Sequence, residues 1–324
     1  MANVTTIDIT NNEGSPTFPL NVNGVYDLVE TIASQNIRAV KSVNPIEDAF
    51  YDYDVKDGSV IEEAIIAMAQ AQSFVNTGTP DLKPLDPTLY VKYFNNWEKK
   101  QFQATTRITD IRNIIANKGV GFEEVISQIL STLSEGEGYE DMTEMLYTFS
   151  SIYEDAIFDD ASPTLFDSKS PATAKGIIYC AREMYNALKA TNQIGSVPTE
   201  QATPVEDIRI AIPESILNLL DVTELANVFN LSKEELFGKL VVLPFADEDT
   251  FAGAGHVIYV YDRKALGRGT RLFEYSQDKI GKGLYTNHYL TTDRIYFVNT
   301  LFKGMYLDCA SAIAAEKANL LTSD

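Results

Sequence analysis

The stretch from Asp221 to Phe245, DVTELANVFNLSKEELFGKLVVLPF, gives the clearest indication of the architecture. Asp221 and Ser232 each precede a helix-like run and have a glutamate three residues later, which is the spacing of a capping box. Gly238 follows the second run, where helices commonly end in a left-handed residue. The run LVVL at Leu240–Leu243 predicts a buried strand. The segment therefore predicts two short helices and a strand, and it contains no catalytic motif.

The length of 324 residues is compatible with one large domain or with two ordinary ones. A compact chain of this size buries roughly 75% of the surface that its unfolded form exposes, so a sizeable core is expected. No apolar run reaches the roughly 18 residues that cross a membrane. The first residues, MANVTTIDITNNEGS, have neither a basic start nor an apolar stretch, so we expect no secretory signal.

The chain is strongly acidic, because 26 basic against 46 acidic side chains leave a formal net charge of −20. It therefore lacks the basic surface that is typical of nucleic-acid binders. Anionic membranes would repel it for the same reason, so we expect no membrane partner. Acidity also favours solubility, which is the simpler explanation of the charge. The only cysteines, Cys180 and Cys309, exclude a disulfide framework and indicate synthesis in a cytosol.

Sequence motifs for catalysis and metal binding are missing. His256 and His288 are the only histidines, and neither has a second His or Cys at the spacing of a zinc ligand. No glycine-flanked serine resembles a nucleophile elbow. The run AGAGHV at Ala252–Val257 lacks the third glycine of a dinucleotide loop. We interpret both histidines as structural and expect no catalytic residue, no metal and no cofactor.

The first third of the chain has the pattern of an extended structure that cannot form a core alone. Residues 1–48 are broken up by prolines and asparagines, and residues 49–106 are expected to be mostly extended. A turn is predicted at Lys56–Gly58, and Leu89–Thr106 is predicted to be the returning half of a hairpin whose tip lies at Lys56–Ser59. The alanine, glutamate, methionine and glutamine content of Ser59–Phe74 favours helix. The family resemblance given below implies instead that Ser59–Ile66 is extended, and Ala67–Phe74 stays open between helix and strand.

Large aromatic side chains gather in this returning half, among them Tyr93, Phe102 and the only tryptophan, Trp97. A two-stranded hairpin is marginal in water by itself. Side chains of this size therefore need a partner surface, which is either the body of the same chain or another subunit. The residues alone leave these two alternatives open.

Helical periodicity follows from Arg107 onward, and the remainder is mixed. Gly136 and Gly138 are expected to interrupt or kink the helices of this region. A further helix is predicted at Ala174–Thr191, and Pro213 suits the first position of a short helix. Strands are predicted at Ile208–Ile212, His256–Tyr261, Arg271–Tyr275, Tyr285–Leu290 and Arg294–Leu301. The chain is therefore expected to be α+β.

Several segments resemble a known family in the same order along the chain. They are DVTELANVFNLSKEELFG with YVYDRKAL (Tyr259–Leu266) and KGLYTNHYLTTDRIYFVNTLFKGMYL (Lys282–Leu307), and upstream DGSVIEEAIIAMA (Asp57–Ala69) and GFEEVISQILSTL (Gly121–Leu133). These segments resemble the major capsid proteins of small short-tailed phages of the phi-twenty-nine kind, whose shells use the HK-ninety-seven-type fold. The resemblance covers most of the chain and depends on order and spacing.

The resemblance implies an arrangement of five segments. An N-terminal arm would comprise residues 1–48, an extended hairpin loop 49–106, and a peripheral domain with a long spine helix 107–170. An axial α/β domain would comprise residues 171–293, and the C-terminal strands and tail of the peripheral domain 294–324. The residues expected to contact other subunits are Lys56, Asp57, Gly58, Tyr93, Trp97 and Phe102. Replacing Trp97 by alanine is expected to impair assembly more than folding of the subunit.

By the same resemblance, the chain is expected to be a structural, non-catalytic head protein that self-assembles through pentamers and hexamers into an icosahedral shell. The implied partners are many copies of itself, scaffolding and portal proteins, and enclosed double-stranded DNA that is held without sequence-specific binding. Its place would be the virion capsid, assembled in the cytoplasm of a bacterial host. Two alternatives remain: a nanocompartment shell of the same fold that encloses a cargo enzyme, and a soluble acidic enzyme or binding protein.

Overall fold

The computed structural model describes residues 44–53, 55, 60–67, 87–107, 122–160, 174–191, 194, 197–198, 201–217, 239–245, 254–311 and 313–314. These residues divide into two compact units. Unit 1 contains the described residues of Lys99–Tyr139 and Leu272–Thr292. Unit 2 contains those of Asn44–Glu98, Glu140–Arg271 and Asp293–Asp324.

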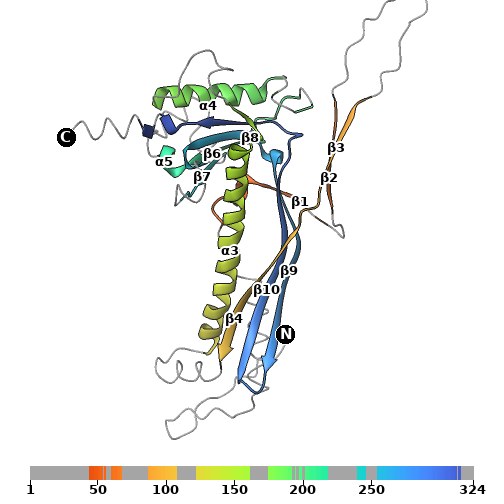
Figure 1. Ribbon diagram of the computed structural model, residues 1–324, viewed down its shortest axis with the longest axis vertical. Helices are drawn as coiled ribbons and strands as arrows, with labels where there is room; N and C mark the ends of the chain where they lie inside the picture. The colour runs from red at the N-terminus through yellow and green to blue at the C-terminus, as the bar shows by residue number, and fades with distance from the viewer. Residues whose placement is uncertain are drawn as a thin grey trace, which may run out of the picture. The chain divides into compact units, whose positions relative to one another are not determined.

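Unit 2 is built on a mixed sheet with the strand order β5-β11-β8-β6-β7. Figure 1 labels the strands β6, β7 and β8 of this sheet. Antiparallel pairing joins β11 to β8 and β8 to β6, while β7 and β5 pair in parallel with β6 and β11 at the two edges. The five strands are β5 (Asp159–Asp160), β6 (Ile208–Pro213), β7 (Leu240–Leu243), β8 (Val257–Asp262) and β11 (Gly304–Asp308). Short helices precede or follow them: α5 (Glu214–Leu217), η2 (Ala254–His256) and η3 (Arg263–Ala265).

Both faces of this sheet are covered, which explains why β8 is apolar and buried along nearly its whole length. On one face, Ile258 and Val260 belong to a core that includes the helix α4 (Ala174–Lys189). On the other face, Tyr259 and Tyr261 pack with the second half of the helix α3 (Phe122–Glu154). The members of α3 in this second core are Met145, Leu146, Phe149 and Ile152. Because successive side chains of a strand point to opposite faces, β8 contributes side chains to the hydrophobic cores on both sides of the sheet.

The helix α3 has 33 residues and is about 50 Å long at 1.5 Å per residue. It continues through Gly136 and Gly138, so the predicted interruption at these glycines is wrong. A glycine costs a helix only about 1 kcal/mol relative to alanine, and packing compensates for a cost of that size. At Gly136, a Cβ atom would lie 3.7 Å from Cδ1 of Phe102, so the ring of β4 covers this position.

A second sheet has the strand order β1-β9-β10-β4. Its strands are β1 (Tyr51–Tyr53), β4 (Glu98–Arg107), β9 (Leu266–Ile280) and β10 (Tyr285–Val298). The part of β9 and β10 that lies in unit 1 encloses unusually polar buried side chains, including Thr286, Asn287 and His288. Thr105 donates to Oδ1 of Asn287 at 2.8 Å, so hydrogen bonds replace part of the usual apolar packing.

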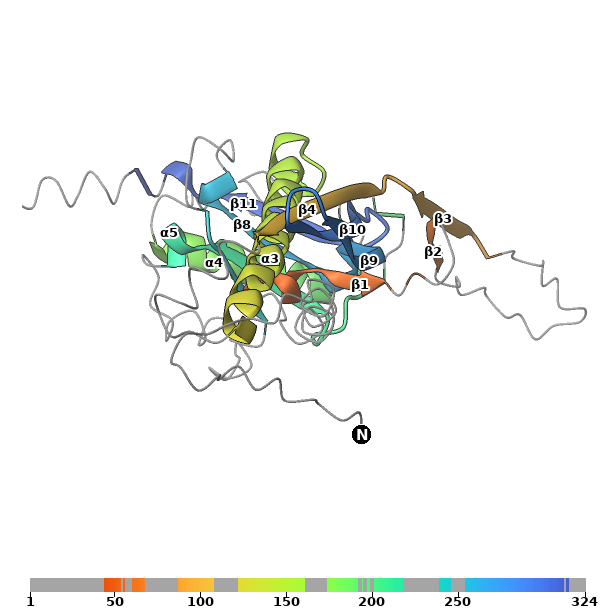
Figure 2. The same ribbon diagram turned by 90° about the horizontal axis from the view of Figure 1, so that it is seen from below.

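The hairpin of unit 2 differs from the predicted one. The strands β2 (Ile61–Ile66) and β3 (Leu89–Phe94) lie side by side and pair antiparallel (Figure 2). Ile61 lies opposite Phe94, and Ile66 lies opposite Leu89. The connection between these strands therefore lies between residues 66 and 89, and the predicted tip at Lys56–Ser59 is wrong. Residues 56–59 instead connect β2 to β1, which pairs in parallel with β9. The pairing of β1 depends on β9, which lies more than 200 positions later in the sequence.

Many local predictions are confirmed. The helix at Ala174–Thr191 and the strands at Ile208–Ile212, Leu240–Leu243 and His256–Tyr261 are present with shifts of a few residues. The strands predicted at Tyr285–Leu290 and Arg294–Leu301 form the single strand β10. Pro213, predicted as the first residue of a short helix, is instead the last residue of β6, and α5 begins one position later at Glu214. Residues 221–238 and 67–74 lie outside the described residues, apart from Ala67. Leu272–Thr292 shares a unit with Lys99–Tyr139, whereas the expected segments assign it to the axial domain.

Candidate assembly interface

The hairpin of β2 and β3 presents apolar side chains to solvent. The exposed fractions are 56% for Ile66, 57% for Leu89 and 64% for Tyr93. Within the described residues, the two strands form a sheet of their own and join neither of the larger sheets. A two-stranded sheet is marginally stable in water, and clustered exposed apolar groups mark interaction sites. The hairpin is therefore a candidate surface for binding another protein.

The root of the hairpin is held by aromatic packing on β10. Phe94 stacks on Phe297 with ring centroids 3.9 Å apart and an interplanar angle of 19°. Ile61 is buried in the same cluster with Ile295, and Trp97 packs at its edge. A cation–π contact adds to this, since the guanidinium carbon of Arg271 lies 4.9 Å from the centre of the Trp97 ring. The root is thus rigidly attached to the body of unit 2.

Two polar contacts continue this attachment along the hairpin. Nζ of Lys92 in β3 donates to Oγ1 of Thr300, and burial lowers the pKa of Lys92. Nε2 of Gln201 donates to the backbone oxygen of Ile66 at 3.2 Å, at the end of β2. Both contacts fix the direction of the two strands relative to the body. The side chains that remain exposed are therefore presented in one orientation.

The structure places the predicted contact residues as follows. Among the three that the structure describes, Tyr93 is the most exposed, whereas Trp97 is half-buried against its own chain through the contacts described above. Phe102 is partly buried in unit 1, where it covers Gly136. Lys56, Asp57 and Gly58 lie outside the described residues. Contact of any of these residues with another subunit stays a prediction. Ile66 and Leu89, which the sequence patterns did not single out, are further candidates beside Tyr93.

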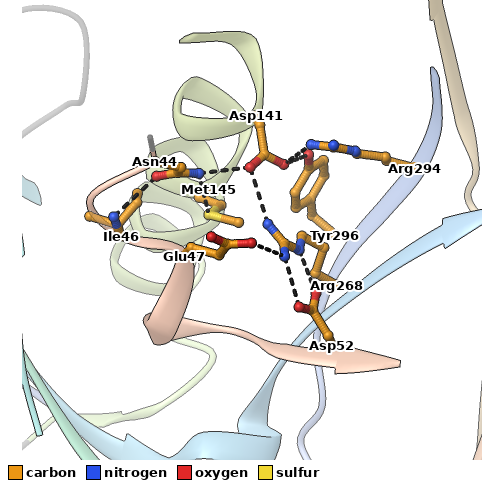
Figure 3. Close-up of polar contacts among 9 residues, drawn as sticks. All are labelled: Asn44, Ile46, Glu47, Asp52, Asp141, Met145, Arg268, Arg294 and Tyr296. Atoms are coloured by element: carbon orange, nitrogen blue, oxygen red, sulfur yellow. Dashed lines mark hydrogen bonds and ion pairs between the residues drawn. The ribbon is translucent and has the colours of Figure 1, made fainter. Parts of the chain in front are cut away.

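A buried ionic cluster lies where the described chain begins, and Figure 3 shows its members. Arg268 of β9 binds three carboxylates: its Nε lies 2.6 Å from Oδ1 of Asp52, its Nη2 lies 3.0 Å from Oε1 of Glu47, and its Nη1 lies 3.1 Å from Oδ2 of Asp141. Burial by itself lowers the pKa of Arg268, but hydrogen bonding to Asp52 and the charge of Asp141 raise the pKa above its usual value. The guanidinium is therefore permanently charged.

Asp141 of α3 is the centre of this cluster. Its Oδ2 also accepts from Nδ2 of Asn44 at 2.7 Å, and its Oδ1 accepts from Nη1 of Arg294 and from the hydroxyl of Tyr296. Burial and the charge of Asp141 raise the pKa of Tyr296, so its hydroxyl stays protonated and donates. Four donors from three segments, Asn44 before η1, Arg268 of β9 and the β10 residues Arg294 and Tyr296, therefore converge on one carboxylate of α3.

The cluster positions the first described residues of the chain. Asn44 and Asp52 lie on either side of the short helix η1 (Glu47–Ala49), and Glu47 is its first residue. Ile46 and Phe50, which adjoin η1, are buried against α3. Sequence analysis missed this cluster, because its members are scattered over more than 200 positions. The one local signal was an arginine between two glycines in an apolar strand, Gly267 and Gly269, where an unpaired charge would be costly.

Features that would support catalysis are limited. His288 is fully buried, its Nδ1 lies 2.6 Å from the hydroxyl of Tyr275, and burial lowers its pKa to about 4. This environment agrees with the structural role expected for it. Among the described residues, no group of three or more His, Cys, Asp or Glu side chains is arranged to hold a metal ion. No helix in the described part is long and apolar enough to cross a membrane.

Comparisons with known proteins give one family. The model of the family described as Phi29-like phage major capsid protein matches residues 1–306. The major capsid protein of Bacillus phage GA-1 is 25% identical over a match of 200 residues, and the match covers 54% of this chain and 40% of that protein. The chain therefore matches less than half the length of this relative.

Solved structures show the same fold. The capsid structure of Staphylococcus phage Andhra has a TM-score of 0.63 at 13% identity and covers 84% of this chain and 85% of that one. The mature capsid of bacteriophage PhiM1 has a TM-score of 0.50 at 10% identity and covers 81% and 86%. At these identities the comparisons establish the fold alone. They confirm the predicted α+β class and its HK-ninety-seven-type architecture.

Proposed function

Since the chain belongs to the Phi29-like phage major capsid protein family, we propose that its copies assemble through pentamers and hexamers into the icosahedral shell of a phage head. The role is structural, and the chain supplies no catalysis. The shell encloses double-stranded DNA without sequence-specific binding, and the net charge of −20 supports a wall that does not grip its content. Assembly takes place in the cytoplasm of the bacterial host, with scaffolding and portal proteins as further partners.

The hairpin of β2 and β3 is the observation that carries this proposal. Its root is fixed by Phe94 and Trp97, while Ile66, Leu89 and Tyr93 are exposed. A rigid root with an apolar, exposed remainder is the arrangement expected of a segment that is completed by a neighbouring copy. Strand edges can pair with that neighbour, and apolar contacts add to the pairing.

A shell contact of this kind joins different surfaces of two identical copies. Such head-to-tail contacts close into rings when the rotation between copies allows it, which produces pentamers and hexamers. A stable interface buries roughly 1,200–2,000 Å² in total, more than three exposed side chains provide. We therefore include Lys56–Gly58, Trp97 and Phe102 among the residues that contact neighbours. The arm of residues 1–48 contributes further area.

The segments of the family fold are assigned accordingly. The helix α3 is the spine helix of the peripheral domain, and the sheet between α3 and α4 is the core of the axial domain. The nanocompartment alternative is not favoured, because the matching family is one of phage capsids. A soluble acidic enzyme is disfavoured for the same reason.

Substitution at the hairpin tests the proposal directly. We expect Tyr93→Ser combined with Leu89→Ser to abolish particles in negative-stain microscopy, while the circular dichroism and urea midpoint of the unassembled subunit stay unchanged. Tyr179→Ser, which replaces an exposed tyrosine of α4, is the matched control and should leave particles intact. Normal particles from the double variant would contradict the assignment of the hairpin. Particles of the unsubstituted protein that contain a cargo enzyme in place of DNA would contradict the phage head.

A further inference from the structure

Three cationic side chains gather where β6 begins and β8 ends. Arg209 belongs to β6, and Arg263 and Lys264 belong to η3, which follows β8 directly. The antiparallel pairing of the two strands brings these positions together, because Ile208 lies opposite Asp262. Burial lowers the pKa of Arg209, and the nearby charge of Arg263 lowers it further. These three side chains, the cationic cluster, stand out in a chain whose net charge is −20.

The cationic cluster is held by uncharged groups of its own subunit. Nη1 of Arg209 donates to two backbone oxygens, at 2.7 and 3.2 Å. The guanidinium carbon of Arg263 and Nζ of Lys264 lie 6.0 and 5.6 Å from the centre of the Tyr51 ring. Among the described residues, none of the three side chains forms an ion pair with a carboxylate, and Nε of both arginines is buried without a hydrogen-bond partner. Because all three side chains are partly exposed, the cluster is a candidate site for an anion.

A single carboxylate suits this site better than a nucleic acid. Burial lowers the pKa of Arg209, and the charges of Asp207 and Asp48 counteract this effect, so both acids lie near the cluster. Asp262 lies there too, and its Oδ1 accepts from the backbone nitrogen of Lys264 at 3.0 Å. DNA, which carries one negative charge per roughly 1.7 Å, would bring many charges against these acids. One aspartate or glutamate brings a single charge that matches the planar fork of a guanidinium.

The hairpin presents a carboxylate of this kind. Glu62 of β2 is exposed, and within the described residues it makes no hydrogen bond or ion pair. Its neighbour Ile61 is buried at the hairpin root, and Ile65 lines a cavity of the body, of about 190 Å³. Because side chains alternate along a strand, Glu62 points away from its own body. It lies directly opposite Tyr93, so the hairpin presents a carboxylate and an exposed ring side by side.

The two surfaces are complementary in charge and in aromatic character. Copies with a net charge of −20 repel one another, so a contact between them needs local pairs of opposite charge. Glu62 supplies the carboxylate, and Tyr93 supplies a ring that can join Tyr51, over which both cations of η3 lie. We propose that Glu62 in the hairpin of one copy binds the cationic cluster of a second copy as the shell assembles. This inference rests on the proposed function, and it names the surface that receives the hairpin.

Reversal of the charges tests the proposed pair. Glu62→Lys and Arg263→Glu should each lower the particle yield at least about tenfold, because like charges across an interface are costly. The two substitutions combined should restore most of the yield, since the pair is then re-formed with its signs exchanged. Glu274→Lys makes the same charge change at an exposed glutamate of β9 and should leave the yield unchanged. Circular dichroism and urea midpoints of the unassembled subunits identify folded variants, and Lys264→Glu replaces Arg263→Glu if the latter does not fold.

A cysteine pair gives a second readout that does not depend on charge. Glu62→Cys combined with Lys264→Cys should form disulfide-linked species of twice the subunit mass or more when particles are oxidised. Glu62→Cys combined with Glu274→Cys is the matched control and should remain at the subunit mass. The native cysteines, Cys180 and Cys309, are buried and do not interfere.

Four outcomes would overturn the inference. They are normal particles from Glu62→Lys, an equal loss of yield in Glu274→Lys, no recovery in the combined variant, and a cysteine pair that links only within one subunit. Intact particles of Arg263→Glu that have lost their DNA would also overturn it, because the occupant would then be a phosphate of DNA. Each of these results leaves the proposed shell function standing, whereas failure of the unsubstituted protein to form particles would contradict both.

Discussion

Replacing Asp141 by asparagine should strongly destabilise unit 2, although the side chain keeps its shape. The carboxylate accepts from four donors, two on each oxygen: Arg294 and Tyr296 on Oδ1, and Asn44 and Arg268 on Oδ2. An asparagine has one acceptor oxygen, so its amide group must face two of these donors in either orientation. Arg294 also loses its ion pair with this buried carboxylate.

The expected cost follows from burial. Asp141 is 5% exposed, and removal of one partner of a buried ion pair typically costs 3–5 kcal/mol, so we expect a loss of about 4 kcal/mol. The matched control is Asp52→Asn, which removes a carboxylate from the same Arg268 at a side chain that is 63% exposed. Exposed ion pairs contribute about 0–1 kcal/mol, so the control should change little.

Urea unfolding of the unassembled subunit measures both variants. The fluorescence of Trp97 is a suitable signal, because it is the only tryptophan and it packs in unit 2. We expect the free energy of unfolding to fall by about 4 kcal/mol for Asp141→Asn and by less than about 1 kcal/mol for Asp52→Asn. Equal losses in the two variants would refute the reasoning that burial at Asp141 organises the cluster.

Three further outcomes are expected. Acid should destabilise the subunit through His288, because burial lowers its pKa from 6.5 to about 4. The contribution of the neutral side chain to stability is complete above pH 6.5, and up to about 3 kcal/mol of it is lost as the pH falls to 4. His288→Gln should therefore flatten this part of the pH profile of urea midpoints. Gly267→Ala should lower the melting temperature, because its Cβ would lie 2.2 Å from the ring of Phe297; an unchanged melting temperature would show that the ring moves away freely. Trp97→Ala, which the sequence predicts to impair assembly more than folding, should also lower subunit stability by about 1–3 kcal/mol, because Trp97 packs on Arg271 of its own chain. A loss of particle yield with unchanged subunit stability would show that this intrachain contact is energetically unimportant.

Much of the secondary structure was accessible from local patterns. Leu240–Leu243 and Ile208–Ile212 are apolar and β-branched enough to predict strands, and α4 has a clear amphipathic period. These predictions succeed because the apolar pattern of a buried strand or helix lies in consecutive residues of the sequence. The resemblance in the order of segments was sufficient for the fold and the family, as the comparisons confirm.

The pairing of segments that are distant in sequence could not be predicted from local patterns. The turn-like residues Lys56–Gly58 misled the hairpin prediction because β1 finds its partner in β9, more than 200 positions later. The glycines at 136 and 138 do not break α3, since packing outweighs a local helix penalty of about 1 kcal/mol each. No local sequence pattern indicates that Arg268 and Asp141 interact, and only the tertiary structure brings them together. Local propensity is a property of neighbouring residues, whereas strand partners and buried charge clusters depend on which surfaces the whole chain can bring into contact.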